Sequence, residues 1–179
     1  MGNDAVHTIL VLAFLVLAAA FQDMVPSFCG TKVPISALMV SYWAFSLGAR
    51  ASQRTESHAP WFRCMAIATV AGLMEDALSG FPAGCCTGYS ILVATATLFA
   101  REHLEELSPM ARGLVVGVIG APLHELWLAG WGLAGDSTLL VGFFASSLPA
   151  AVAGMLVFRI VPRLEIAAGI YDADRGGVA

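Results

Sequence analysis

Two pairs of ionisable side chains interrupt otherwise apolar stretches of the sequence. Glu75 and Asp76 are neighbours in one stretch, and His124 and Glu125 are neighbours in another. Ionisable groups are costly to bury in such surroundings, so by default they indicate a functional site. One acid from each pair could supply the paired catalytic groups of an intramembrane hydrolase. Alternatively, the two acids could form a polar cluster with a shared proton or a protonated His124.

No motif supports catalysis by these residues. Neither pair lies in a metalloprotease, serine-hydrolase or nucleotide-binding motif, and GLAGDST lacks the lysine and the spacing of a P-loop. The four cysteines form no CxxC pair and have no histidine at metal-ligand spacing. We therefore predict no catalytic residue, no metal and no cofactor, and interpret the acids as a cluster for a partner or ligand. A disulfide from Cys29 to Cys85 or Cys86 is left open.

The composition is typical of a lipid-facing protein. Of the 179 residues, 58% are hydrophobic and 12% are charged, and the mean hydropathy is +0.79. Soluble domains have about 45–50% apolar and about 25% charged residues, so a water-soluble core in a chain this short cannot bury so much apolar surface. The net charge of −4 and the single lysine leave no basic face for nucleic acid.

Six stretches are long enough, or nearly so, to cross a bilayer core, which needs about 20 apolar residues per helix. They are Val6–Met24, Val33–Ala49, Trp61–Leu78, Cys85–Ala100, Gly113–Ala134 and Thr138–Ile160. The first stretch follows MGNDAVH, which lacks the positive charge of a secretion signal, so we expect it to be retained as a helix. The segment REHLEELSPMAR can continue the fourth helix.

The positive charges orient these segments. With six spans, eight arginines fall on the side that holds both termini, and Lys32 falls alone on the other side. Positive residues mark the cytoplasmic side of a membrane protein. The sequence therefore predicts an all-α integral membrane protein, a bundle of six transmembrane helices over residues 1–164 with both termini cytoplasmic. The Gly-rich acidic tail, 165–179, is expected to be disordered.

Small residues recur at every fourth position around the acids. One stripe is Ala68, Gly72, Asp76, Gly80 and Gly84, and the other is Gly113, Gly117, Ala121, Glu125 and Ala129. In lipid, such stripes allow helices to approach closely. Asp76 and Glu125 each follow an arginine by 13 residues, about 20 Å along a helix, and so lie at matching depth. We predict that the third and fifth segments cross through these stripes. Asp76 then meets His124 or Glu125, while Glu75 points toward the headgroups.

Three stretches resemble the rod-shape-determining membrane protein family MreD. VPISALMVSYWAF is similar to that family's proline-led helix with an aromatic pair, here Pro34 and Tyr42-Trp43. GLMEDALSGFPAGCCTGYSILVATA is similar to its G-L-x-x-D-x-x-x-G-x-x-x-G run, which leads to a tyrosine, here Tyr89. LPAAVAGMLVFRIVPRL is similar to its last helix, which has a Leu-Pro start and a basic exit.

The resemblance covers residues 33–100 and 148–164, and it implies a function. It implies a non-catalytic, multi-pass protein of the bacterial inner membrane that scaffolds peptidoglycan synthesis along the cell cylinder. The implied partners are an MreC-like protein, MreB filaments, RodA and the class B penicillin-binding transpeptidase. Glu75 stands where the family usually has an apolar residue, and His124-Glu125 has no role in the family pattern.

The alternative is the substrate-binding membrane subunit of an energy-coupling-factor vitamin transporter. Such subunits also have six short helices in a chain of this length, and polar residues near the outer side suit ligand capture. A vitamin binder needs outer loops that cap its ligand, whereas loops 79–84 and 135–137 are very short. An intramembrane hydrolase that uses Asp76 and Glu125 is a third class, without a supporting motif.

Overall fold

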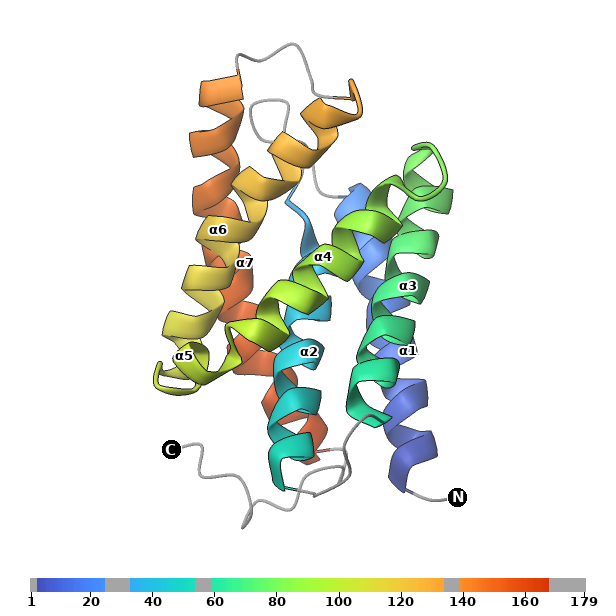
Figure 1. Ribbon diagram of the computed structural model, residues 1–179, viewed down its shortest axis with the longest axis vertical. Helices are drawn as coiled ribbons and strands as arrows, with labels where there is room; N and C mark the ends of the chain where they lie inside the picture. The colour runs from blue at the N-terminus through green and yellow to red at the C-terminus, as the bar shows by residue number, and fades with distance from the viewer. Residues whose placement is uncertain (1–2, 25–32, 54–58, 134–138, 168–179) are drawn as a thin grey trace.

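The computed structural model describes residues 3–24, 33–53, 59–133 and 139–167, which form seven α-helices (Figure 1). They are α1 (Asn3–Met24), α2 (Ile35–Gln53), α3 (Ala59–Ser79), α4 (Cys85–Phe99), α5 (Arg101–Glu105), α6 (Pro109–Gly130) and α7 (Leu139–Ala167). No strand occurs within these ranges. The prediction of an all-α protein is confirmed, and each of the six predicted segments overlaps one long helix.

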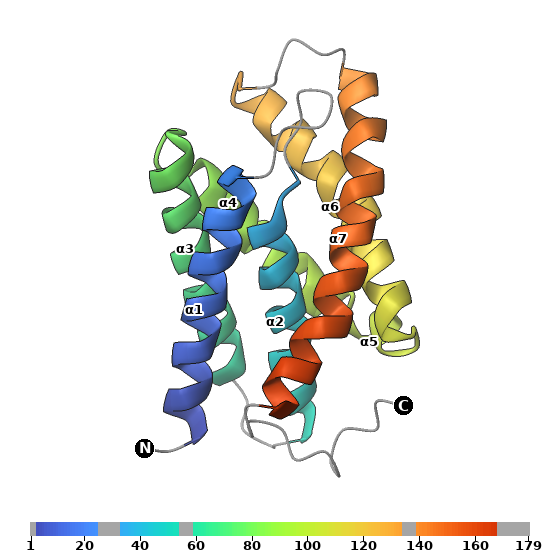
Figure 2. The ribbon, with the colours of Figure 1, turned by 180° about the vertical axis from the view of Figure 1, so that it is seen from behind.

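The long helices run alternately up and down a bundle, as Figures 1 and 2 show. α2 lies in the middle and packs against α1, α3, α4, α6 and α7. The most extensive contact is between α6 and α7, and the next is between α3 and α4. α1 begins and α7 ends at the same end of the bundle, as an even number of crossings requires (Figure 1).

The helix boundaries around α5 have local causes. Ala100 keeps a helical backbone between α4 and α5, so the fourth segment continues into α5 as the sequence predicted. Ser108 caps α6 through a hydrogen bond that its side chain accepts from Ala111 N at 3.3 Å, and Pro109 occupies the first turn of that helix. The Arg112 guanidinium donates from Nε to Leu104 O at 2.7 Å, which holds the turn between α5 and α6.

An aromatic cluster on α2 forms the centre of the core. Trp43 has no exposed surface and lies with its ring centroid 6.4 Å from that of Phe14 on α1. Tyr42 meets Phe158 of α7 edge to face at 5.5 Å, and Phe45 lies 6.3 Å from the same ring. α2 therefore connects the first and last helices through large rings, whose burial dominates core energetics.

The small-residue stripes pack helices closely, but against partners other than the predicted ones. A Cβ atom on Gly113 would collide with the backbone of Gly154, and Gly117 is equally close to α7. A Cβ atom on Gly72 would collide with Thr87 of α4. The predicted crossing of the third and fifth segments is wrong. Each of these helices packs instead on the helix that follows it in the chain, because the short connections favour antiparallel neighbours.

Gly80 and Gly84 have a different role from the packing predicted for them. Both have positive φ angles, 69° and 97°, and neither has an atom close to the position of a Cβ. Residues with side chains rarely adopt such angles, so these two glycines shape the turn that folds α4 back onto α3. Their prediction as helix-packing residues is wrong.

Large apolar side chains cover the outward faces of the helices. Examples from five helices are Leu17, Phe62, Phe99, Leu126 and Leu148, each more than 60% exposed. Among the described residues, two stretches, Pro109–Gly130 and Phe144–Ala167, are long and apolar enough to cross a membrane. The second continues beyond the predicted domain boundary at 164.

The closeness of α6 and α7 can be tested with one substitution at two sites. Gly117→Ala places a methyl group against the α7 backbone, and overpacking of this kind typically costs about 1–3 kcal/mol of folding free energy. Gly130→Ala, in the same helix, points into open space and is expected to leave stability unchanged or slightly raised. Thermal unfolding of the detergent-solubilised variants compares them. Equal stability of the two variants would contradict this packing.

Candidate functional site

Asp76 caps the N-terminus of α4. Its Oδ2 accepts hydrogen bonds from Gly84 N at 2.8 Å and from the Thr87 hydroxyl at 2.9 Å, and its Oδ1 accepts one from Cys86 N at 2.6 Å. The first N–H groups of a helix have no partner within the helix, and the helix dipole favours a negative charge at this end. Asp76 is 6% exposed, and its carboxylate is held by the start of the neighbouring helix.

This arrangement explains the spacing of the G-x-x-x-D-x-x-x-G-x-x-x-G run. Gly72 lets α4 approach α3, and Gly80 and Gly84 supply the left-handed backbone of the turn. Asp76, in the last turn of α3, then lies opposite the amide groups that the turn brings back. The four positions form one unit, a capped helical hairpin, and they do not form a continuous packing stripe.

Glu75 lies in a second polar cluster, at the junction of α1, α2 and α3. Its Oε1 accepts a hydrogen bond from Gln22 Nε2 at 2.6 Å, and its Oε2 accepts one from the Ser36 hydroxyl. Gln22 Oε1 in turn accepts from Ser36 N at 3.1 Å. Glu75 is only 5% exposed, so the prediction that it reaches the headgroups is wrong. Its partners are the end of α1 and the start of α2, which sequence spacing does not reveal.

His124 and Glu125 lie apart from both acids of α3. The His124 ring is buried and meets the Tyr89 ring of α4 edge to face, with centroids 4.8 Å apart. Its Nδ1 has no hydrogen-bond partner among the described residues. Glu125 is partly exposed and makes no hydrogen bond or ion pair within the described ranges. The predicted pocket that joins Asp76 to these residues is wrong, because α4 lies between α3 and α6 (Figure 1).

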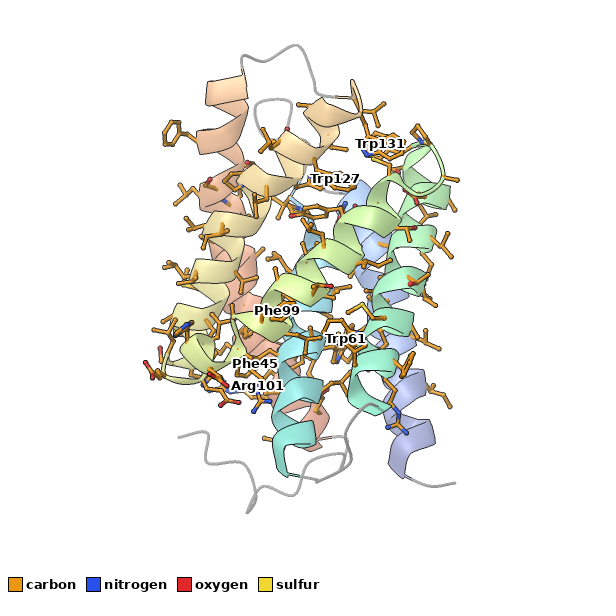
Figure 3. All side chains as sticks on the ribbon, in the orientation of Figure 1. Phe45, Trp61, Phe99, Arg101, Trp127 and Trp131 are labelled. Atoms are coloured by element: carbon orange, nitrogen blue, oxygen red, sulfur yellow. The ribbon has the colours of Figure 1, made fainter. Side chains whose placement is uncertain are left out.

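The contact between α4 and α6 is an aromatic seam that the sequence did not predict. Trp127 donates from Nε1 to Cys85 O at 2.9 Å, and a Cβ on Gly88 would press against its ring. The Tyr89 hydroxyl donates to Gly120 O at 2.5 Å. Trp127 lies near the upper end of the bundle in Figure 3. The sequence feature that could have predicted this contact is the Gly88-Tyr89 pair, because a small residue permits close packing and a buried tyrosine hydroxyl needs a hydrogen-bond acceptor.

Glu165 is a third buried acid, and it lies in the segment predicted to be disordered. It has no exposed surface, and it accepts hydrogen bonds from the Tyr42 hydroxyl at 2.8 Å and from Trp43 Nε1 at 3.4 Å. These bonds explain why α7 continues to Ala167. Buried Tyr and Trp side chains usually need a hydrogen-bond acceptor, so the Tyr42-Trp43 pair was the sequence feature that could have predicted a buried acid nearby.

Each buried acid therefore has its own set of structural donors, and no two of them converge on one point. Within the described residues, no group of three or more His, Cys, Asp and Glu side chains is placed to hold a metal ion. Cys85 and Cys86 are buried free thiols, and Cys29, the other half of the disulfide left open above, lies outside the described residues.

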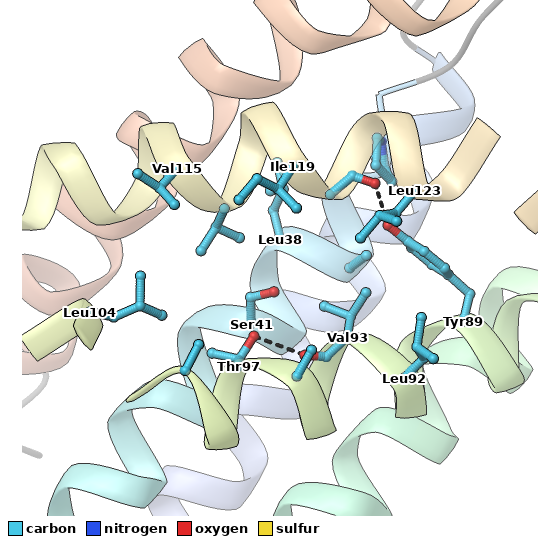
Figure 4. A pocket seen from close by; sticks show the side chains of 16 residues that line it. Leu38, Ser41, Tyr89, Leu92, Val93, Thr97, Leu104, Val115, Ile119 and Leu123 are labelled. Carbon is cyan, nitrogen blue, oxygen red and sulfur yellow. Dashed lines mark hydrogen bonds between the residues drawn. The ribbon is translucent and has the colours of Figure 1, made fainter. Parts of the chain in front are cut away.

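An apolar groove lies between α4 and α6, with α2 as its floor (Figure 4). Leu38 lies in the floor, Val93, Ile119 and Leu123 lie in the walls, and the groove encloses about 130 Å³. Tyr89 closes one end, and Leu104 of α5 lies at the other. The groove suits an apolar occupant, because almost all of its accessible lining is apolar.

Comparison of the chain with protein-family models, with curated proteins and with solved structures gave no match.

The capping role of Asp76 predicts a large effect of its removal. Asp76→Ala leaves four donors at the start of α4 without this acceptor, and the loss of a capping side chain costs about 0.5–2 kcal/mol of stability. Glu125→Ala is the control, because that side chain holds no described partner. Thermal unfolding in detergent should show a lower midpoint for Asp76→Ala alone. A variant as stable as the unmodified protein would refute the cap.

Proposed function

We propose that this chain is a non-catalytic, multi-pass protein of the bacterial inner membrane, similar to the MreD family, with six transmembrane helices and both termini cytoplasmic. The observation that carries the proposal is the Asp76 cap. The most specific part of the resemblance, the run around Asp76, works as one capped hairpin. The aromatic pair of the second resembling stretch, Tyr42 and Trp43, lies at the centre of the core.

The outward surface supports a membrane location. Large side chains such as Phe62, Phe144 and Leu148 are more than 70% exposed, which is unusual for a protein surrounded by water. Trp131, just after α6, lies near the upper end of the bundle, and Trp61, in the first turn of α3, lies lower down; both side chains are exposed (Figure 3). Tryptophan is enriched at the two interfaces of a membrane.

The chemistry of the buried acids supports a scaffold. Asp76, Glu75 and Glu165 are each occupied by donors that join two or more helices, so they stabilise the bundle. The proposed role is to support peptidoglycan synthesis during cell elongation. The proposed partners are an MreC-like protein, MreB filaments, RodA and the class B penicillin-binding transpeptidase.

One observation favours the alternative, a vitamin-binding subunit of an energy-coupling-factor transporter. Gln22, Ser36 and Glu75 bring three polar side chains together where α1 ends and α2 begins. These side chains are bonded to one another, however, and the groove between α4 and α6 is apolar. A water-soluble vitamin needs polar contacts to fix its orientation. The scaffold remains the better-supported proposal.

Coexpression with an MreC-like protein tests the proposal. We expect a tagged form of this chain to be extracted from the membrane fraction only by detergent and to copurify with the MreC-like protein. An unrelated polytopic membrane protein of similar size, with the same tag, serves as the control and should not copurify with it. Recovery of a tightly bound vitamin, or association with a transport ATPase, would support the alternative. Recovery in the soluble fraction would contradict both.

A further inference from the structure

The groove between α4 and α6 is too small for a helix and large enough for part of a slender chain. Its volume of about 130 Å³ is close to that of a cavity of about 150 Å³ that accepts benzene, whereas a helix with its side chains is about 10–12 Å across. Its rim is open, since Leu92 and Ile119 are 46% and 54% exposed. In a bilayer, this rim would face lipid tails.

One polar atom in the floor of the groove lacks a partner. Ser41 lines the groove and has no exposed surface, and its Oγ makes no hydrogen bond within the described residues. A buried hydroxyl without a partner lowers stability. An occupant with a hydrogen-bond acceptor at the depth of Ser41 would satisfy it. A purely hydrocarbon occupant would not.

The end of the groove at α5 carries charges of both signs. The Arg112 guanidinium lies 4.5 Å from the centroid of the Phe45 ring, and Phe45 follows Ser41 by one helical turn, about 6 Å along α2. Arg101 directly follows Ala100, a lining residue, and pairs with Glu105 at 2.6 Å. Glu105 is exposed and Arg101 is partly exposed, and ion pairs at the surface are weak, so an anionic group can compete for Arg101.

Three acidic side chains lie at the same end of the groove as Arg101 and Arg112. Glu102, Glu105 and Glu106 are all exposed on α5 and the turn after it. A ligand head that carries both a phosphate and an ammonium group can place the phosphate at the arginines and the ammonium at the glutamates. The ester carbonyls of a phospholipid lie only a few bonds from its phosphate, on the side of the acyl chains, where Ser41 lies.

We infer that the groove is a binding site for one phospholipid with an ammonium headgroup, of the phosphatidylethanolamine type. Its phosphate binds at Arg101 and Arg112, an ester carbonyl accepts a hydrogen bond from the Ser41 hydroxyl, and one acyl chain lies along Val93 and Ile119. The inference rests on the proposed function only for the membrane location, and it is independent of the MreC-like partner.

Two pairs of matched variants test the site by native mass spectrometry of delipidated protein titrated with phosphatidylethanolamine. Ser41→Ala removes the hydroxyl in the groove, and Ser90→Ala removes a second buried hydroxyl without a described partner, which does not line the groove. We expect about threefold weaker binding for Ser41→Ala, the effect of one hydrogen bond in a membrane protein, and none for Ser90→Ala. Equal effects of the two variants, or no effect of either, would overturn the role of Ser41.

The second pair fills the groove. Ala96→Phe puts a ring into it, whereas Ala66→Phe puts the same ring on the exposed face of α3. We expect at least about tenfold weaker binding for Ala96→Phe alone. If both variants keep the lipid, the groove does not hold it. If Ala96→Phe instead loses an MreC-like protein and keeps the lipid, the groove is a protein-docking site and the inference is wrong.

A photoreactive residue in place of Ile119 separates the two occupants in native membranes. Lipid adducts are expected, and a protein adduct as the main product would overturn the inference. Copurification with the MreC-like protein is scored in the same preparations. Absence of lipid adducts with intact copurification would refute the lipid site and leave the proposed function standing. Lipid adducts without copurification would support the lipid site and contradict the proposed function.

Discussion

The carboxylate of Asp76 bonded to the start of α4 is the contact on which the middle of the bundle depends. The first N–H groups of a helix with a buried start have no water to bond, and a buried acid needs donors of its own. Here each satisfies the other, at 2.6 Å from Cys86 N and 2.8 Å from Gly84 N. The bond fixes the direction of α4, which places Tyr89 against His124 and forms one wall of the groove.

The same rule governs the other buried acids. Glu75 joins α1, α2 and α3 through Gln22 and Ser36, and Glu165 joins α7 to α2 through Tyr42 and Trp43. Between these polar junctions the helices are held by close packing, most tightly where glycines of α6 and α7 meet. Two kinds of contact therefore stabilise the bundle: hydrogen bonds to the buried acids and close packing at small residues in the helix interiors.

The helices themselves could be predicted from the sequence, because its long apolar runs are interrupted by Ser108-Pro109 and by the turn SGFPAG, which leaves few alternatives. The helix that packs against each glycine stripe could not be predicted. A four-residue period shows which face of a helix carries small side chains, but it does not show which helix packs against that face. Gly80 and Gly84 fitted the stripe by spacing alone, although their backbone angles serve the turn. Glu165 was missed because it lies beyond the last apolar run, and its donors, Tyr42 and Trp43, are distant in sequence.

Hydrogen exchange of the α4 amides in Asp76→Asn tests the central contact most directly. The asparagine keeps the size of the side chain but removes its charge and one of its two acceptor oxygens. If Asp76 holds the start of α4, the amides of Gly84 and Cys86 will exchange markedly faster in the variant, while amides in the interior of α6 remain protected. Unchanged exchange at Gly84 and Cys86 would show that α4 is positioned by other contacts and would contradict this account.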